Sequence, residues 1–233
     1  MNCKEVSIII PWRDIRQIDR NMIAKWVLER YKFLFPDAEI ILSDSGDNVF
    51  SRARSINLGV EKSKGDYLII TDADYLFSEK MAKDIINKHS WTVSAQQKNY
   101  YFFNESITHK ILKEDAKFDL KSFVVGKNAT ASPYPTYGQL MAMPKENFVG
   151  FDEEMIGYGW EDNVFYCCMK SIYGKEFRTD NNLYHLFHAR PPVSRYMQRS
   201  YVNQSYYDTV WKPIENDSEK IKALMKEKGM FFK

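Results

Sequence analysis

The hydrophobic residues of this chain fall into short continuous runs separated by segments with helical spacing. The runs over 6–11 and 67–70 hardly alternate with polar residues, which is typical of buried strands, and 39–43 is predicted as a further strand between them. Apolar residues recur at helical intervals over 14–35 and 48–63. Strands and helices that alternate with short connections predict right-handed crossovers and a parallel sheet. We therefore predict an α/β fold with a mostly parallel central sheet flanked by helices.

The rest of the chain continues this pattern less regularly. The remaining predicted elements are a helix over 78–88, a strand over 91–95, an insertion over 98–135 with a helix near 104–114, a strand over 138–143, a helix over 161–174 and a charged helical tail from Ser194. Because no linker is visible, we predict one main domain over 1–193. A helical C-terminal extension over 194–233 is expected to pack on it.

Composition narrows the functional classes. The net charge of the 233 residues is only +2, so the charge balance does not favour a nucleic-acid partner. Three cysteines make no disulfide framework and indicate a reducing compartment. No signal peptide is visible, and no apolar run is long enough to span a bilayer. We therefore expect a cytoplasmic protein.

Charged residues gather where the predicted strands end. Asp72 and Asp74 follow the third strand, at the edge where open α/β sheets bind ligands. Arg13 follows the first strand and Arg52 the second, so all four side chains are expected at one edge. Arginines there suit a phosphate or a carboxylate. The alternatives are a solvated loop or helix cap for the acids, and ordinary surface ion pairs for the arginines.

Two later segments also carry candidate chemistry. The segment "VGFDEEMIGYGWEDNVF" (149–165) leads through three glycines to Glu161 and Asp162 at the start of a helix. The helix dipole alone explains acids at this position, but a glycine-containing loop that leads to acids is also typical of a mobile lid carrying a base. His185 and His188 lie three residues apart in an apolar run, where a packed histidine is the alternative to a ligand.

Five segments together resemble one group of enzymes. In chain order they are "VSIIIPWRD", "NVFSRARSINLGV", "LIITDAD", "VGFDEEM" and "GYGWEDNVF". Their order and approximate spacing resemble those of the β-1,4-galactosyltransferases, the transferase domains of chondroitin polymerase and, more distantly, the polypeptide GalNAc-transferases. The resemblance covers residues 4–190. It implies a Rossmann-like GT-A glycosyltransferase fold with a nucleotide-sugar donor and a divalent metal, usually manganese.

The resemblance also implies roles for individual residues. Asp162 takes the place of the catalytic base, and Glu161 that of an acceptor contact. Asp74 takes the place of a metal ligand together with His185, with His188 as a rival. Contacts with the nucleotide sugar are implied for Pro11, Trp12, Arg13, Phe50, Arg52, Asp72, Ala73, Gly138 and Trp160. The sequence departs from the family where Gly138-Gln139 replaces a Gly-Gly pair, and where the acidic run after the loop ends at Asn163.

With these roles, the resemblance implies a metal-dependent, inverting transfer of a hexose from a UDP-sugar to a saccharide or lipid-linked saccharide. Galactose and N-acetylgalactosamine are the expected sugars, and surface polysaccharide or glycoconjugate synthesis is the expected setting. Carboxylate and imidazole ligands favour Mn²⁺, with Mg²⁺ as the alternative. A single base opposite the leaving group predicts inversion.

Two other functions remain open at this level. A sugar-nucleotide nucleotidyltransferase should carry a glycine-rich, lysine-containing loop after the first strand, and "PWRDIRQ" has no glycine. A non-catalytic nucleotide-sugar or saccharide-binding relative would have no need for Asp74, Asp162 and a metal-binding histidine together. The C-terminal segment, with Leu224, Met225, Phe231 and Phe232 among lysines, also raises the hypothesis of peripheral contact with the inner face of a membrane.

Overall fold

The protein is built around a six-stranded sheet with the strand order β2-β1-β3-β8-β5-β9. A computed structural model describes residues 5–14, 18–95, 99–120, 129–131, 137–157, 159–189 and 193–230. The three strands predicted from the apolar runs pair in parallel; they are β1 (Val6–Pro11), β2 (Glu39–Ser43) and β3 (Tyr67–Thr71). The predicted α/β fold class is confirmed.

The other half of the sheet contains one reversed strand, while the remaining five of the six strands run in one direction, so the sheet is mostly parallel as predicted. β8 (Leu140–Pro144) lies between β3 and β5 (Thr92–Ala95) and is antiparallel to both. β9 (Phe177–Thr179) then pairs in parallel with β5. The apolar run of β8 indicates a buried strand, but it does not show in which direction the strand runs. The sequence pattern therefore could not show that β8 runs the opposite way.

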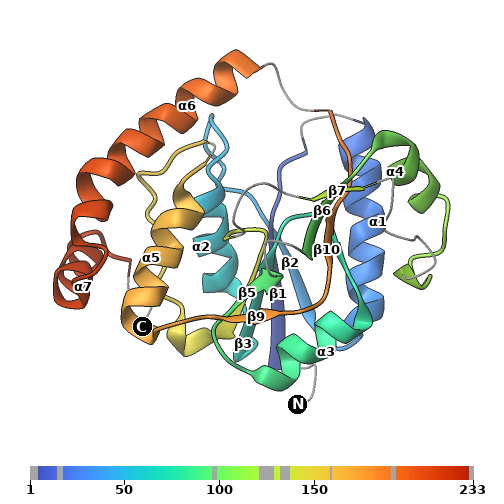
Figure 1. Cartoon of the computed structure of the whole chain (residues 1–233), viewed down its shortest axis with the longest axis horizontal. Helices are drawn as coiled ribbons and strands as arrows, with labels where there is room; N and C mark the ends of the chain where they lie inside the picture. The colour runs from blue at the N-terminus through green and yellow to red at the C-terminus, as the bar shows by residue number, and fades with distance from the viewer. Residues whose placement is uncertain are drawn as a thin grey trace.

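Helices cover both faces of the sheet, and the sheet separates the core into two clusters (Figure 1). On one face, α1 (Ile18–Leu34) contributes Tyr31 to a cluster that also holds residues of β1 and β3. On the other face, α2 (Arg52–Lys62) and α5 (Glu161–Tyr173) contribute buried residues to the second cluster. α3 (Glu79–Lys88) and α4 (Glu105–Ile111) complete the helices of the main domain.

The predicted start of the second helix at residue 48 is four residues too early. Ser51 is the N-cap of α2, and its hydroxyl accepts a hydrogen bond from the backbone N–H of Arg54. A serine cap satisfies one of the amide groups that have no partner in the first helical turn. Because of this cap, the residues before Ser51 belong to the loop and Arg52 is the first residue of the helix.

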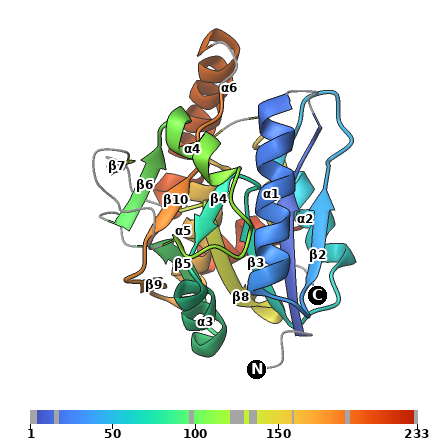
Figure 2. The same ribbon diagram turned by 90° about the vertical axis from the view of Figure 1, so that its right-hand side faces the viewer.

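A second, four-stranded sheet has the order β4-β10-β6-β7 (Figure 2). Its strands are β4 (Tyr75–Phe77), β6 (Tyr100–Phe103), β7 (Ala129–Ala131) and β10 (Leu183–His185). The sequence did not predict this sheet, because strands of three or four residues leave too short a pattern. Its consequence for the site is direct: the pairing of β10 with β4 sets His185 opposite Tyr75, the residue after Asp74.

The C-terminal segment packs on the main domain beside α5 (Figure 1). It consists of α6 (Val193–Tyr206), a π-helical turn (Tyr207–Trp211), a 3-10 turn (Lys212–Ile214) and α7 (Ser218–Glu227). The buried carboxylate of Asp152 holds this segment, because its Oδ2 accepts from Tyr206 Oη at 2.8 Å and from Trp211 Nε1 at 3.0 Å.

The apolar residues of α7 face the protein. Met225 is fully buried, and Leu224 packs against the second core cluster. Both residues were part of the hypothesis of membrane contact, while Phe231 and Phe232 lie outside the described residues. Among the helices that the structure describes, none combines the length and the apolar character needed to cross a bilayer.

Candidate functional site

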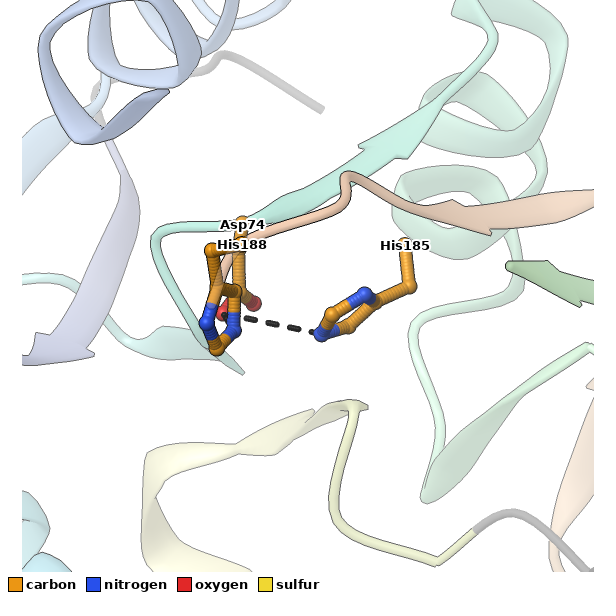
Figure 3. Close-up of side chains that lie close together, drawn as sticks. All are labelled: Asp74, His185 and His188. Atoms are coloured by element: carbon orange, nitrogen blue, oxygen red, sulfur yellow. Dashed lines mark ion pairs between the residues drawn. The ribbon is translucent and has the colours of Figure 1, made fainter. Parts of the chain in front are cut away.

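Asp74 and both candidate histidines come together at the edge of the main sheet (Figure 3). Asp74 Oδ2 lies 3.2 Å from His188 Nε2 and 3.7 Å from His185 Nε2. The candidate ligand atoms of the three residues all lie within 4.8 Å of one another. The sequence posed the histidines as rivals, whereas the structure places both against the same carboxylate. We call these three residues the Asp–His cluster.

Hydrogen bonds to backbone carbonyls set the position of this cluster. The N–H of Leu186 donates to the carbonyl of Asp74 at 2.9 Å, which ties the end of β10 to the Asp74 turn. The buried hydroxyl of Tyr31 donates to the carbonyl of Tyr75 at 2.9 Å and so fixes the turn from the side of α1. His188 contacts Asp74 from the loop after β10, three residues beyond His185 in the chain.

The electrostatics of the cluster favour a negative carboxylate. Burial alone raises the pKa of Asp74, but His185 and His188 outweigh it and lower that pKa to about 2. His188 Nδ1 lies 3.1 Å from the carbonyl of Ala189, which can only accept a hydrogen bond, so Nδ1 carries a proton. With Nδ1 protonated, Nε2 donates to Asp74 only in the doubly protonated ring, whereas the neutral ring offers its Nε2 lone pair to a metal ion in place of that hydrogen bond.

Arg52 links the other predicted acids. Its Nε donates to Asp72 Oδ1 at 2.9 Å, its Nη2 to the carbonyl of Gly138 at 2.7 Å, and its Nη1 lies 3.5 Å from Glu161 Oε1. The Arg52 side chain is only 14% exposed, so these contacts are shielded from water. Burial lowers the pKa of Arg52, but the three acids at 72, 161 and 162 outweigh it and raise that pKa. This arginine therefore stays charged inside a ring of acids.

Asp72 has a different environment from Asp74 although only one residue separates them. Burial raises the pKa of Asp72, which Arg52 partly offsets, and the resulting value is about 6. The negative charge of Asp74 also raises it. The two acids of the motif thus belong to different contacts, since Asp72 is paired with Arg52 and Asp74 with the histidines.

Glu161 and Asp162, which we call the acid pair, begin α5 as predicted. Glu161 is buried, and its Oε2 has no hydrogen-bond partner among the described residues. Burial, together with the charge of Asp162, raises the pKa of Glu161 to about 7. Burial also raises the pKa of Asp162, against the opposing effects of Arg52 and of the backbone N–H groups of Asn163 and Gly138. Both acids therefore hold a proton more readily than in water.

Gly138 is the residue that lets the acid pair approach β8. A Cβ atom built on Gly138 would lie 2.6 Å from both Cβ and Oδ2 of Asp162, closer than real atoms pack. Any larger residue must displace Asp162 or the strand. The position of Asp162 therefore requires a glycine at residue 138. The departure from the family pattern falls on the next residue, Gln139.

The residues predicted to contact the nucleotide lie around the end of β1. Arg13 forms a two-pronged ion pair with Asp44, with Nε 2.8 Å from Oδ2, and its guanidinium lies 5.4 Å from the centre of the Phe50 ring. Trp12 is held by a backbone hydrogen bond to the carbonyl of Ser43. Pro11 and Ala73 are buried, so contact through their side chains would require the chain to open.

The C-terminal part of the loop over 149–160, which we call the glycine loop, is held by the C-terminal segment. Asn203 of α6 donates to the carbonyls of Ile156 at 3.2 Å and of Gly159 at 2.9 Å. Trp160, in the left-handed conformation with φ 75°, packs on Tyr207 with ring centres 5.3 Å apart. Sequence reasoning missed Asp44, Asp152 and Asn203, and no short motif marks an anchor supplied from a distant element.

Comparison with a family model places the chain in a class. The model of the glycosyltransferase-like family 2 matches residues 32–178, more than half of the chain. The chain therefore belongs to this family, and the fold and family together define a glycosyltransferase with a GT-A fold. The finer resemblance to the β-1,4-galactosyltransferase and chondroitin polymerase group stays a prediction.

Two solved structures resemble this chain at low sequence identity. One is a mutant of Drosophila β-1,4-galactosyltransferase 7 in complex with manganese, UDP-Gal and xylobiose, with 14% identity, 84% of this chain and 79% of that chain covered, and a TM-score of 0.49. The other is S. aureus TarS 1-349, with 12% identity, 90% of this chain and 73% of that chain covered, and a TM-score of 0.43. These similarities are too low to assign a substrate. No curated protein matches the sequence.

Proposed function

We propose that this protein is a metal-dependent, inverting glycosyltransferase that moves a hexose from a UDP-sugar to a saccharide acceptor. One observation carries the proposal: the buried Arg52 joins Asp72, which adjoins the Asp–His cluster, to Glu161, which adjoins Asp162. A group of metal-ligand type and a pair of acids with raised pKa values therefore face one site. Perturbed acids beside such a cluster are typical of catalytic sites.

The Asp–His cluster fits a divalent transition-metal ion. One carboxylate and two imidazoles suit Mn²⁺ better than Mg²⁺, which prefers oxygen ligands. Asp74 Oδ1 is buried without a hydrogen-bond partner among the described residues, and a cation would satisfy it. A divalent cation at this position supplies positive charge against the leaving nucleoside diphosphate.

The acid pair supplies the proton acceptor. We assign Asp162 as the general base, because its carboxylate lies at the start of α5 against Gly138, and its raised pKa brings its basicity closer to neutral pH. Glu161 is more deeply buried and contacts Arg52, which suits a residue that orients the acceptor. A single base on the acceptor side gives direct displacement with inversion.

The nucleotide is assigned to the end of β1 and the start of α2, where Trp12, Arg13 and Phe50 lie. Arg52, with its donors engaged by Asp72, Gly138 and Glu161, holds the site together, and its contact with a diphosphate is indirect in this arrangement. The transfer of galactose or N-acetylgalactosamine, to a soluble or lipid-linked saccharide in surface polysaccharide or glycoconjugate synthesis, rests on the sequence resemblance.

The experiment that tests the proposal measures donor hydrolysis. The purified chain is incubated with UDP- and GDP-sugars and Mn²⁺, Mg²⁺ or excess chelator, and nucleotide release is followed with the wild type, Asp74→Ala and the matched surface control Asp84→Ala. We expect release from a UDP-hexose with Mn²⁺, its loss in chelator and in Asp74→Ala, and no change in Asp84→Ala, because the contacts of Asp84 with the described residues are with Lys80 and Asn181, which are not candidate site residues.

Three results contradict the proposal. Full activity in excess chelator removes the metal from the mechanism. Release of pyrophosphate from a nucleoside triphosphate and a sugar phosphate indicates a nucleotidyltransferase. Tight binding of a sugar nucleotide without turnover under any metal, with any acceptor in a saccharide panel, indicates a non-catalytic relative.

A further inference from the structure

A cavity of about 500 Å³ lies along α5, on the side where the C-terminal segment packs. Its size falls within the range of roughly 300–1,000 Å³ that is common for ligand sites. Three tyrosines, Tyr137, Tyr166 and Tyr207, line it together with the polar residues Asn163, Lys170 and Glu215. Nothing in the nucleotide, metal or base assignments uses this cavity.

Residues next to the acid pair and to Gly138 in the chain line one end of the cavity. Tyr137 directly precedes Gly138, the residue against which Asp162 packs, and Asn163 directly follows Asp162. Tyr207 contacts the ring of Trp160, the residue before Glu161. From Asn163 to Lys170 the cavity follows α5 for about 10 Å at the usual helical rise. It is therefore longer than one sugar ring and starts at the residue that follows the proposed base in the chain.

The lining has the chemistry of a carbohydrate site. Tyr137 and Tyr166 lie with ring centres 4.5 Å apart, and hydroxyl groups pair with carboxylates at the cavity wall, as in the 3.0 Å contact between Tyr207 Oη and Glu215 Oε2. Flat rings contact the apolar faces of sugars, while amides and carboxylates bind sugar hydroxyls. The side-chain amide of Asn163 has no hydrogen-bond partner among the described residues.

The charge of the lining favours a neutral ligand. Lys170 is the only cation among the described lining residues, and Glu215 offsets it. An anionic polymer would require several arginines or lysines. We therefore propose that this cavity binds a neutral saccharide unit of the acceptor chain, beyond the unit that receives the hexose. The proposal rests on the proposed function, since it deepens the acceptor side of that site.

The unusual backbone of the C-terminal segment supports this assignment. The π-helical turn Tyr207–Trp211 directs Tyr207 toward the cavity, while Trp211 reaches the buried Asp152 in the core. π-Helical turns are rare and are often found at functional sites. The C-terminal segment would thus contribute one wall of the acceptor site.

Glycan binding by two variants tests the proposal. The full chain, labelled and held with UDP and Mn²⁺, is applied to an array of neutral and acidic oligosaccharides. Ser218→Trp fills the cavity from α7, and Asn163→Ala removes the amide without added bulk. The matched control is Tyr173→Trp, which adds an indole on an exposed position of α5 outside the cavity lining.

We expect the wild type to bind neutral oligosaccharides of two or more units. In Ser218→Trp the new indole should displace the saccharide from the tyrosines, and the dissociation constant should rise by about tenfold or more, the scale of one aromatic contact. It should rise several-fold in Asn163→Ala and stay unchanged in Tyr173→Trp. Binding restricted to acidic glycans, equal binding by wild type and both cavity variants, or no glycan binding overturns the proposal. Donor hydrolysis, measured in parallel, separates this failure from failure of the proposed function.

Discussion

Substitution of Gly138 by alanine should disable the proposed base while leaving the rest of the site intact. The new Cβ would lie 2.6 Å from Asp162 Cβ and Oδ2, whereas ordinary contacts begin at 3.4 Å, so the separation must widen by 0.8 Å. α5 cannot easily move, because Val164 and Phe165 in the same helical turn are fully buried. The carboxylate of Asp162 must therefore rotate or shift.

The expected loss follows from that displacement. A misplacement of about 1 Å can cost on the order of 10² in rate, and overpacking costs about 1–3 kcal/mol of stability. We expect Gly138→Ala to lower acceptor-dependent turnover by about 10²-fold, with Mn²⁺ affinity and thermal folding largely retained. Gly174→Ala is the control at the other end of α5: no atom lies within 4 Å of its Cβ, and the strain comes only from its backbone (φ 77°, ψ −156°), a conformation that essentially only glycine adopts.

Kinetics and thermal melts on the two variants decide the matter. Gly174→Ala should lose about 1–3 kcal/mol of stability with unchanged turnover, because it meets backbone strain alone. Near-normal turnover in a folded Gly138→Ala protein would refute the reasoning that Asp162 acts from its position against this glycine. An equal fall in Mn²⁺ affinity would show that the acid pair and the Asp–His cluster do not act separately.

Four further outcomes are expected. His185→Ala and His188→Ala should each raise the Mn²⁺ concentration needed for donor hydrolysis by more than the roughly 10- to 100-fold that loss of an outer-shell partner costs; a variant that changes only stability would make its histidine a packing residue. Asp162→Asn should lower turnover by about 10²–10⁴ with unchanged affinity for UDP, and near-normal turnover would remove it from the mechanism. Because the pKa of Glu161 is raised to about 7 in the folded state, its contribution to stability is present at low pH and is lost as the pH rises from about 4.5 to about 7. Urea titrations should therefore show Glu161→Gln gaining stability relative to wild type over that window, and a constant difference would contradict the shift. Asp152→Ala should cost about 1–3 kcal/mol in the same titrations, because the buried Trp211 N–H loses its acceptor; an unchanged midpoint would show that this contact does not hold the C-terminal segment.

Strands with long apolar runs could be predicted from the sequence, and short strands could not. β1, β2 and β3 are each five or six residues long and contain at least three consecutive apolar residues, so their pattern stands out. β4 and β10 have only three residues each, and nothing local marks them as partners. Their pairing is what brings His185 to Asp74, and it depends on residues more than a hundred positions apart.

The candidate site was predictable to the extent that its residues lie at strand ends or a helix start. Asp72, Asp74 and Arg52 lie at one edge because parallel strands end there. The sequence suggested Arg52 as a ligand of the diphosphate through the family resemblance, and it gave no sign that the guanidinium would be buried among Asp72, Glu161 and the Gly138 carbonyl. Such contacts depend on β8 running antiparallel beside β3, which the apolar pattern does not encode.

The contacts of Arg52 suggest why the two halves of the site belong to one fold. Asp72 is the first residue after β3, Gly138 precedes β8, and Glu161 begins α5, so one guanidinium bonds to three separate elements. Removal of one acid beside a buried cation strongly destabilises a protein, because the cost of taking the cation out of water is then no longer compensated by that acid. The same cation limits the mutual repulsion of the acids at 72, 161 and 162. Arg52 thus holds the proposed metal site and the proposed acceptor site at a fixed separation, which is a geometric requirement of direct displacement.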